Sequence, residues 1–144
     1  MLLPVLMLVV LVGCAGGSKR SFDVTVENRT KEPIILWLTK SAPPFEEGWK
    51  SPERLAVETP QKVDKVAGVV VEPGQTAQTG EVSGTFAGGA EAILRVYTRV
   101  KSLDDILAAG PGASNRIDLP LTDGANKIAV ISRNGAIEAV RGGK

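Results

Sequence analysis

The residue best suited to chemistry is Cys14, because its thiol is the only one in the 144-residue chain. A thiolate is a nucleophile, so a lone cysteine can carry a covalent modification although it has no partner for an internal disulfide. Cys14 follows an apolar run over residues 2–12 after one intervening residue and is flanked by small residues, Gly13 and Ala15 to Gly17. A single thiol in this position predicts a lipid attachment point.

The apolar run is shorter than the roughly 20 residues that a membrane span needs. Its length matches the hydrophobic region of a secretory signal, about 7–15 residues. The sequence Leu11-Val12-Gly13-Cys14 resembles the lipobox of bacterial lipoproteins with a type II signal peptide, and the resemblance covers residues 1–17 only. One departure is that residues 1–4 lack the Lys or Arg usual in a signal peptide.

The resemblance implies cleavage before Cys14, a diacylglyceryl group on its thiol and usually a further acyl chain on the new amino group. Ala15, where an Asp would retain the protein in the inner membrane of enterobacteria-like cells, implies an outer-membrane lipoprotein that faces the periplasm. Two readings without lipid remain open. Residues 2–12 could be a buried apolar strand with an incidental cysteine, or an uncleaved signal anchor.

This interpretation divides the chain into four parts: a signal peptide (1–13), the lipidated cysteine with a short tether (14–21), a single domain (22–141) and a tail (142–144). About 130 residues remain after cleavage, which is enough for one hydrophobic core. Seventeen Lys and Arg residues nearly balance sixteen Asp and Glu residues. That balance argues against a nucleic-acid-binding protein and against a polybasic membrane-surface protein.

Metal and cofactor chemistry has little support in the composition. The chain contains no histidine, its two methionines lie in the predicted signal peptide, and its one cysteine is assigned to lipid. Zinc, copper, haem and iron–sulfur sites therefore lack their usual ligands, and Ser-His-Asp or Cys-His catalysis lacks its base. We expect no metal, no cofactor and no enzymatic activity.

The rest of the sequence is typical of short β-strands separated by turns. Apolar alternation predicts strands at 22–27, 34–38, 66–71, 75–86, 91–100, 116–121, 127–132 and 136–140. Residues 34–38 are apolar on both faces, which favours a central position. The Thr- and Gly-rich segment 75–86 and the segment that contains Pro120 are typical of edge strands.

Local signals define the turns and helices between these strands. Asn134-Gly135 predicts a tight hairpin, and Pro73-Gly74 suits the middle of a type II turn. Ser51-Pro52 predicts the start of a one-turn helix over 51–56. Ser102 predicts the cap of a two-turn helix over 102–109.

Together these elements predict an all-β fold, an antiparallel β-sandwich of seven or eight strands with two short helical inserts. On pattern alone the sandwich resembles immunoglobulin-like or transthyretin-like modules. A small closed barrel is the alternative architecture.

Five residues form the predicted binding patch. Phe45 and Trp49 lie in the Pro-rich segment 41–50, and aromatic residues in loops are enriched at interaction hot spots. Arg95, Tyr97 and Arg99 alternate along one strand face and would add a polar stripe. The alternatives are that Phe45 and Trp49 cap one end of the sandwich, and that the arginines lie on a solvent-facing strand surface.

Other candidate sites are weaker. The adjacent acidic pairs Glu46-Glu47 and Asp104-Asp105 do not face each other across a substrate, as paired catalytic carboxylates must. Segment 122–126 has too few oxygen ligands for a calcium loop, and the glycines of 84–89 lack the lysine and helix of a phosphate-binding loop.

The sequence therefore favours a lipid-anchored cell-envelope protein with a binding or structural role. Its partners would be the membrane, through the lipid on Cys14, and a neighbouring envelope protein or polymer. Two alternatives remain: a periplasmic chaperone-like or inhibitor module that offers segment 75–86 as an edge strand, and a carboxylate-dependent hydrolase.

Overall fold

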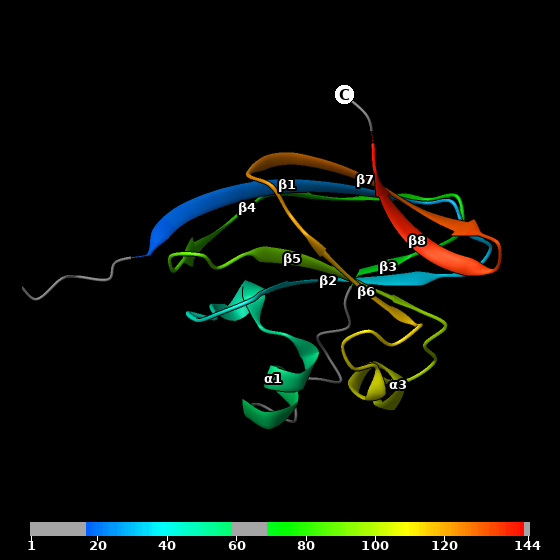
Figure 1. The fold of residues 1–144 in the computed structure, drawn as a ribbon, viewed down its shortest axis with the longest axis horizontal. Coiled ribbons are helices and arrows are strands. Elements are labelled where there is room, and N and C mark those ends of the chain that lie inside the picture. Colours follow the sequence, from blue (N-terminus) through cyan, green and yellow to red (C-terminus); the bar gives the residue numbers. More distant parts are fainter. Residues whose placement is uncertain (1–16, 59–68, 143–144) are drawn as a thin grey trace, which may run out of the picture.

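A computed structural model of the chain describes residues 17–58 and 69–142. The predicted signal peptide, Cys14 and the start of the strand predicted at 66–71 lie outside the described residues. Two four-stranded sheets pack face to face (Figure 1), with strand orders β4-β1-β7-β8 and β3-β2-β5-β6. The first sheet contains β1 (Ser18–Asn28), β4 (Thr76–Phe86), β7 (Gly124–Arg133) and β8 (Ala136–Arg141). The second contains β2 (Ile34–Lys40), β3 (Val69–Val71), β5 (Ala92–Thr98) and β6 (Arg116–Pro120).

The predicted sandwich of short strands is confirmed, and so are several positions within it. β2 lies centrally in its sheet, whereas β4 and β6 lie at sheet edges. One feature of the prediction is wrong: β1 pairs with β7 in parallel, from Phe22 opposite Gly124 to Asn28 opposite Val130. The other five pairings are antiparallel. Alternation reports which face of a strand is buried but not which distant strand becomes its neighbour, so this pairing had no signal in the sequence.

The first strand also begins earlier than the predicted domain start at residue 22. Residues 18–21 pair with residues 83–86 of β4. Apolar alternation starts only at Phe22, because Ser18 to Ser21 are held by backbone pairing and carry no buried apolar side chain. Residues 18–21, the last four of the predicted tether over 14–21, therefore belong to the sheet.

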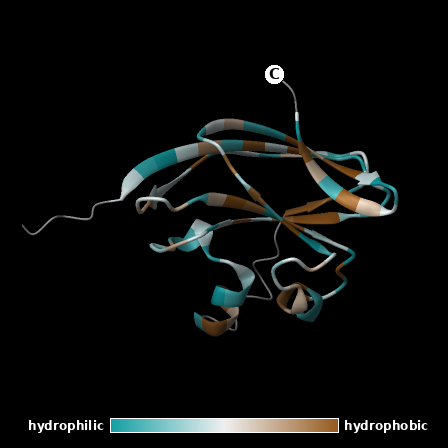
Figure 2. Ribbon diagram, in the orientation of Figure 1, coloured by the Kyte–Doolittle hydropathy of each residue, from teal (hydrophilic) through white to brown (hydrophobic). Residues whose placement is uncertain are grey.

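The main core fills the space between the two sheets. Inward-facing side chains from both layers form it, and Figure 2 shows apolar residues along the facing strands. At one end, Trp49, Phe22 and Phe86 pack edge to face, with ring centroids 5.4–5.7 Å apart. Such edge-to-face pairs add to the free energy of simple area burial.

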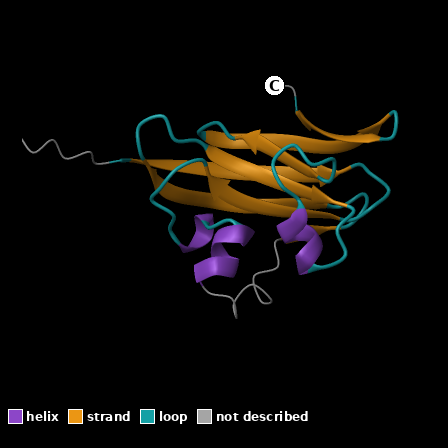
Figure 3. Ribbon diagram, turned by 60° about the horizontal axis from the view of Figure 1, so that its bottom comes forward, coloured by secondary structure: helices purple, strands orange, loops and turns teal. Residues whose placement is uncertain are grey.

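A second, smaller core lies on the outer face of the β3-β2-β5-β6 sheet. Two short helices, α1 (Pro52–Glu58) and α3 (Leu103–Ala108), cover this face (Figure 3). The buried residues of this cluster are Trp37, Leu55, Tyr97, Ile106 and Ala109. The helix-covered face explains why residues 34–38 are apolar on both sides.

The predicted turns and caps are confirmed in detail. Ser102 accepts a hydrogen bond from the backbone N–H of Asp105, whose side chain caps Ser102 in return, so α3 begins with a complete capping box. The Ser51 hydroxyl accepts from the N–H of Arg54 at 3.3 Å at the start of α1. Asn134 and Gly135 both have positive φ, 52° and 78°, as a two-residue hairpin requires.

Candidate functional site

A groove of about 400 Å³ lies between segment 41–50, helix α1 and the helix-covered sheet. Phe45 comes from the loop after β2, whereas Ser51, Glu53, Arg54 and Val57 come from α1 and the residue that caps it. Arg95 reaches the groove from β5. The groove therefore joins Phe45 and Arg95, two of the five predicted patch residues, and is the candidate functional site.

The exposed wall of the groove carries a stacked cation. The guanidinium carbon of Arg54 lies 4.0 Å from the centroid of the Phe45 ring. Val57, one turn further along α1, is 83% exposed. An aromatic ring, a stacked guanidinium and an exposed aliphatic side chain make a surface that can accept a partner with both apolar and acidic groups.

The floor of the groove is a network of charges centred on Arg95, whose side chain is only 8% exposed. Its guanidinium donates to Glu53 at 2.9 Å, to Asp118 at 3.0 Å and to the Tyr97 hydroxyl at 3.2 Å. Arg116 donates to the other oxygen of Asp118 at 2.8 Å and to the carbonyl oxygen of Ala109. This network ties α1 and α3 to the sheet.

The pKa values of this network fit a structural role. Burial acts to raise the pKa of Asp118, but the hydrogen bond from Arg116 and the charge of Arg95 outweigh it, so that pKa lies below its ordinary value. Burial raises the pKa of the Tyr97 hydroxyl despite the hydrogen bond from Arg95. Asp118 is therefore ionised and Tyr97 is neutral near pH 7.

A buried lysine holds the loop that supplies Phe45. The side chain of Lys40 is fully buried and pairs with Glu46. Its Nζ also donates to the carbonyl oxygens of Pro44 at 2.8 Å and Thr85 at 2.6 Å. Burial acts to raise the pKa of Glu46, yet hydrogen bonds from Lys40 and from the N–H of Thr85 lower it to about 2. The pair links β2 to β4 across the two sheets.

The other predicted patch residues lie elsewhere, so the structure does not bring the five together on one surface. Trp49 is 3% exposed in the aromatic end of the main core, and Tyr97 is fully buried beneath the helices. The position of Trp49 agrees with the alternative in which this residue folds back and caps one end of the sandwich. Arg95 lies on a helix-covered face, which is neither an open recognition stripe nor a solvent-facing strand surface.

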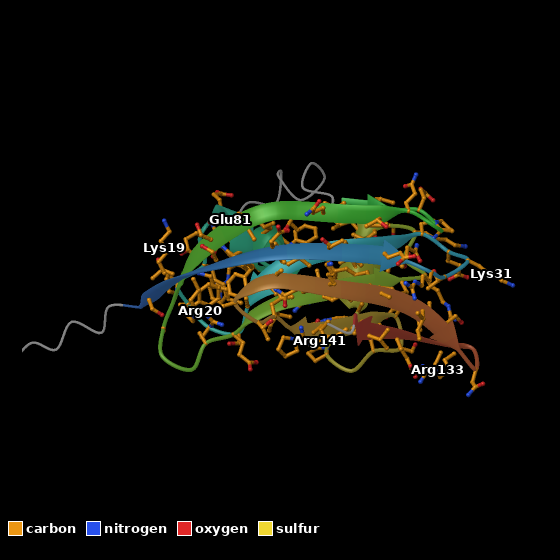
Figure 4. All side chains as sticks on the ribbon, turned by 90° about the horizontal axis from the view of Figure 1, so that it is seen from above. Lys19, Arg20, Lys31, Glu81, Arg133 and Arg141 are labelled. Carbon is orange, nitrogen blue, oxygen red and sulfur yellow. The ribbon has the colours of Figure 1, made fainter. Side chains whose placement is uncertain are left out.

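Arg99 is separate from the groove. It lies just after β5, with a positive φ of 55°, and lines a hollow with Arg29, Lys31 and Glu32. Lys31 lies at the end of the sandwich opposite to Lys19 and Arg20, where the described chain begins (Figure 4). Arg99 is thus a residue of the distal end and contributes nothing to the groove.

The weaker candidates are used for structure. Glu46 binds Lys40, and Asp105 caps α3. The side-chain amide of Asn126 is bonded to Thr122 and Gly124, which closes the turn before β7. Within residues 17–58 and 69–142, no three Asp, Glu, His or Cys side chains gather as metal ligands would. In the same ranges no helix has the length and apolarity of a membrane span.

Several residues of the site were not predicted from the sequence. Lys40, Glu53, Arg54 and Asp118 carry no local pattern that distinguishes them from solvated charges. The only available signal was the position of Lys40 at the end of an apolar strand, directly before the Pro-rich loop.

Comparison with known proteins gives little further guidance. No family model and no curated protein matches the sequence. Among solved structures, the crystal structure of the T6SS lipoprotein TssJ1 from Pseudomonas aeruginosa aligns with a TM-score of 0.38 and 13% sequence identity. The alignment covers 88% of this chain and 99% of that chain. A match this distant carries no conclusion about the present chain.

Proposed function

We propose that the protein is a lipid-anchored component of the bacterial cell envelope that binds a neighbouring envelope component or supports it structurally, without catalysis. The anchor rests on the resemblance of Leu11-Val12-Gly13-Cys14 to a lipobox. The observation that carries the binding role is the groove in which Arg54 stacks on Phe45 beside the exposed Val57. Ala15 after the cysteine favours the outer membrane, with the domain facing the periplasm.

The start of β1 supports a short distance between anchor and domain. Strand pairing begins at Ser18, four residues after Cys14. Four residues span at most about 14 Å when fully extended. A lipid on Cys14 would therefore hold the domain against its own membrane, and its partner would be a component of the same membrane or of the adjacent periplasm.

The carboxylates of the groove do not favour the alternative of a hydrolase. A general acid needs a carboxyl group whose pKa is raised towards neutrality. Two carboxylates line the groove, Glu53 and Glu58. Glu53 is hydrogen-bonded to Arg95. The pKa of Glu58 is lowered by hydrogen bonds from Lys50 and Arg54. Both groups are therefore engaged in ion pairs within the fold.

The anchor is tested by the intact mass of the membrane-extracted protein, measured for wild type and for Cys14→Ser. We expect wild type to lack residues 1–13 and to gain acyl groups, and the variant to show neither change. An unprocessed, unacylated mass for wild type would remove the anchor from the proposal.

The binding site is tested by chemical crosslinking in intact envelopes. Phe45→Ser and Val57→Ser each remove apolar surface from the groove, and we expect both to reduce crosslinking to the partner at least threefold. Arg99→Ser at the distal end is the matched control and should leave crosslinking unchanged. A loss with Arg99→Ser but not with Phe45→Ser would move the site to the distal end.

A further inference from the structure

The two long sides of the sandwich are closed to different extents. On one side Arg141 of β8 donates to the carbonyl oxygen of Pro120 in β6 and, at 3.3 Å, to Asn126, so the edge strands of the two sheets are tied together. Glu81 of β4 lies on the opposite side of the same sheet (Figure 4). There the facing edge strand is β3, whose three residues within the described part of the chain pair with Ile34 to Leu36.

Beyond β3 a partly open, mostly apolar cavity of about 240 Å³ lies between the two layers, with Glu47, Lys50 and Leu55 also at its walls. Its walls include inward-facing residues of both sheets, Val24, Leu36, Leu38, Val69, Ala77 and Leu94. Val69 at its rim is 56% exposed, so apolar surface of β3 faces solvent beside the cavity. The volume exceeds that of a water molecule, about 30 Å³, but an apolar lining gives ordered water few partners.

The edge strand beside this cavity, β4, is protected over only half of its length. The carbonyl oxygen of Ser83 accepts from the indole of Trp49 at 2.9 Å. The carbonyl oxygen of Thr85 accepts from Lys40, and its N–H donates to Glu46 at 2.8 Å. Side chains from segment 40–49 therefore bond to this end of the edge in the way that a neighbouring strand would.

The other half, residues 76–81, has no such side-chain partner on its outer edge among the described residues. The Thr79 side chain is directed towards β1 and not towards the outer edge. Its hydroxyl accepts a hydrogen bond from the N–H of Val24 at a β-bulge next to Gly80. This half also lacks lysine and proline, which commonly protect exposed edges, and Glu81 is its single charge. By contrast, β6 ends in Pro120 and β8 ends in Arg141.

We propose that residues 76–81 of β4 accept an extended segment of a partner protein as an added strand, with apolar side chains of that segment entering the cavity. This inference goes beyond the proposed binding role, because it adds a second site, separate from the groove that contains Phe45, and names the class of partner for that site. Unpaired backbone groups on a sheet edge are best matched by another extended backbone, and the lining of the cavity selects apolar side chains at alternate positions. A second copy of this chain fits poorly, since its own β4 would offer Ala77, Gln78 and Thr79, which are small or polar.

The test uses the full chain with the photo-crosslinking residue benzoylphenylalanine at Gln78, in intact envelopes. The matched control carries the same residue at Ser83, in the protected half of the same strand. We expect Gln78 to crosslink to one short segment of another protein and Ser83 not to do so. Crosslinks only to a second copy of this chain, equal crosslinking at both positions, or none at Gln78 would each overturn the proposal.

A synthetic peptide with the sequence of the crosslinked segment then tests the geometry. It is titrated against the detergent-extracted full chain, and backbone amide exchange is followed. We expect the amides of 76–81 to gain protection, and Ala77→Lys to weaken binding at least tenfold because it places a charge at the cavity. Ser83→Lys should change the affinity less than twofold. Binding without protection of 76–81 would overturn the proposal.

Two measurements keep these outcomes distinct from misfolding and from failure of the proposed function. Thermal melts identify a variant that does not fold, and Thr76→Lys serves as a second edge variant that leaves the cavity unchanged. If Phe45→Ser abolishes crosslinking to an envelope component while Gln78 crosslinks nothing, the binding role stands and strand addition is wrong. The mass of the Cys14 variants tests the anchor separately.

Discussion

The indole Nε1 of Trp49 donates a hydrogen bond to the carbonyl oxygen of Ser83, at 2.9 Å. Trp49 belongs to the short 3-10 helix η1 (Glu47–Trp49) that follows β2, whereas Ser83 belongs to β4 of the opposite sheet. One side chain thus packs in the main core, protects a sheet edge and fixes the loop that carries Phe45. The groove and the half-protected strand depend on this same contact.

Removing the Trp49 hydrogen bond should separate its polar role from its packing role. Trp49→Phe keeps an aromatic ring against Phe22 and Phe86 and should lower the free energy of unfolding by about 1 kcal/mol. Trp49→Ala should cost about 3–5 kcal/mol, because it also leaves a cavity. Urea denaturation followed by circular dichroism gives both values. Equal losses for the two variants would show that packing contributes nothing.

The close approach of Trp49 to β4 predicts a strict requirement for glycine at position 84. A Cβ at Gly84 would lie 2.7 Å from the indole nitrogen of Trp49. Gly84→Ala should therefore destabilise the fold by about 1–3 kcal/mol through overpacking. Gly88→Ala is the control, since a Cβ there meets no atom within 4 Å. Thermal melts should separate the two variants, and similar melts would contradict the contact.

The Lys40–Glu46 pair predicts a defined acid dependence. The pKa of Glu46 is lowered from 4.5 to about 2 in the folded chain. Because the pKa of Glu46 is lower in the folded chain than in the unfolded chain, the ionised carboxylate stabilises the fold at pH values above about 4.5. This contribution is lost as the pH falls from about 4.5 through about 2. Wild type should therefore be more stable than Glu46→Gln at pH 7, with the difference narrowing over that range.

Urea titrations of both proteins at pH 7, 5, 4, 3 and 2 measure this difference. Glu47→Gln, at the neighbouring acidic residue, is the control and should follow the wild-type acid dependence more closely. A constant difference between wild type and Glu46→Gln from pH 7 to pH 2 would contradict the ionic role of Glu46.

The two arginines of the predicted stripe should respond very differently to the same substitution. Arg95→Met leaves Glu53 and Asp118 without their shared donor and should cost about 1–3 kcal/mol. Arg99 is 53% exposed and lies 3.5 Å from Glu32, so Arg99→Met should change stability by no more than about 0.5 kcal/mol. Chemical denaturation tests both, and equal effects would place the two residues in similar environments.

Much of the fold was predictable because its signals are local. Apolar alternation located the strands, and Ser102 and Asn134-Gly135 marked a helix start and a hairpin through hydrogen bonding and backbone preference. Even the edge positions of β4 and β6 had signals, in the Thr- and Gly-rich segment and in Pro120. The early start of β1 had none, because residues 18–21 contribute backbone pairing and no buried apolar side chain.

The candidate site was less predictable because its contacts are long-range. Nothing near Arg95 in the sequence shows that Glu53, forty-two positions away, will approach it. The alternation correctly placed Arg95 and Tyr97 on one face of β5. It could not show that helices cover this face or that Arg99 lies beyond the end of the strand. Phe45 and Trp49 looked equivalent in the sequence, yet the structure places one in a groove and the other in the core.

The position of β1 has a mechanical consequence. This strand is the first of the sandwich, yet it lies inside its sheet, bonded to β4 along one side and to β7 along the other. Ladder hydrogen bonds run roughly across a strand, so a pulling force applied at Ser18 in the direction of β1 loads many of these bonds together in shear. A strand at the sheet edge, pulled sideways, would release them one after another. At Ser18, a force along β1 is therefore resisted by many hydrogen bonds at once.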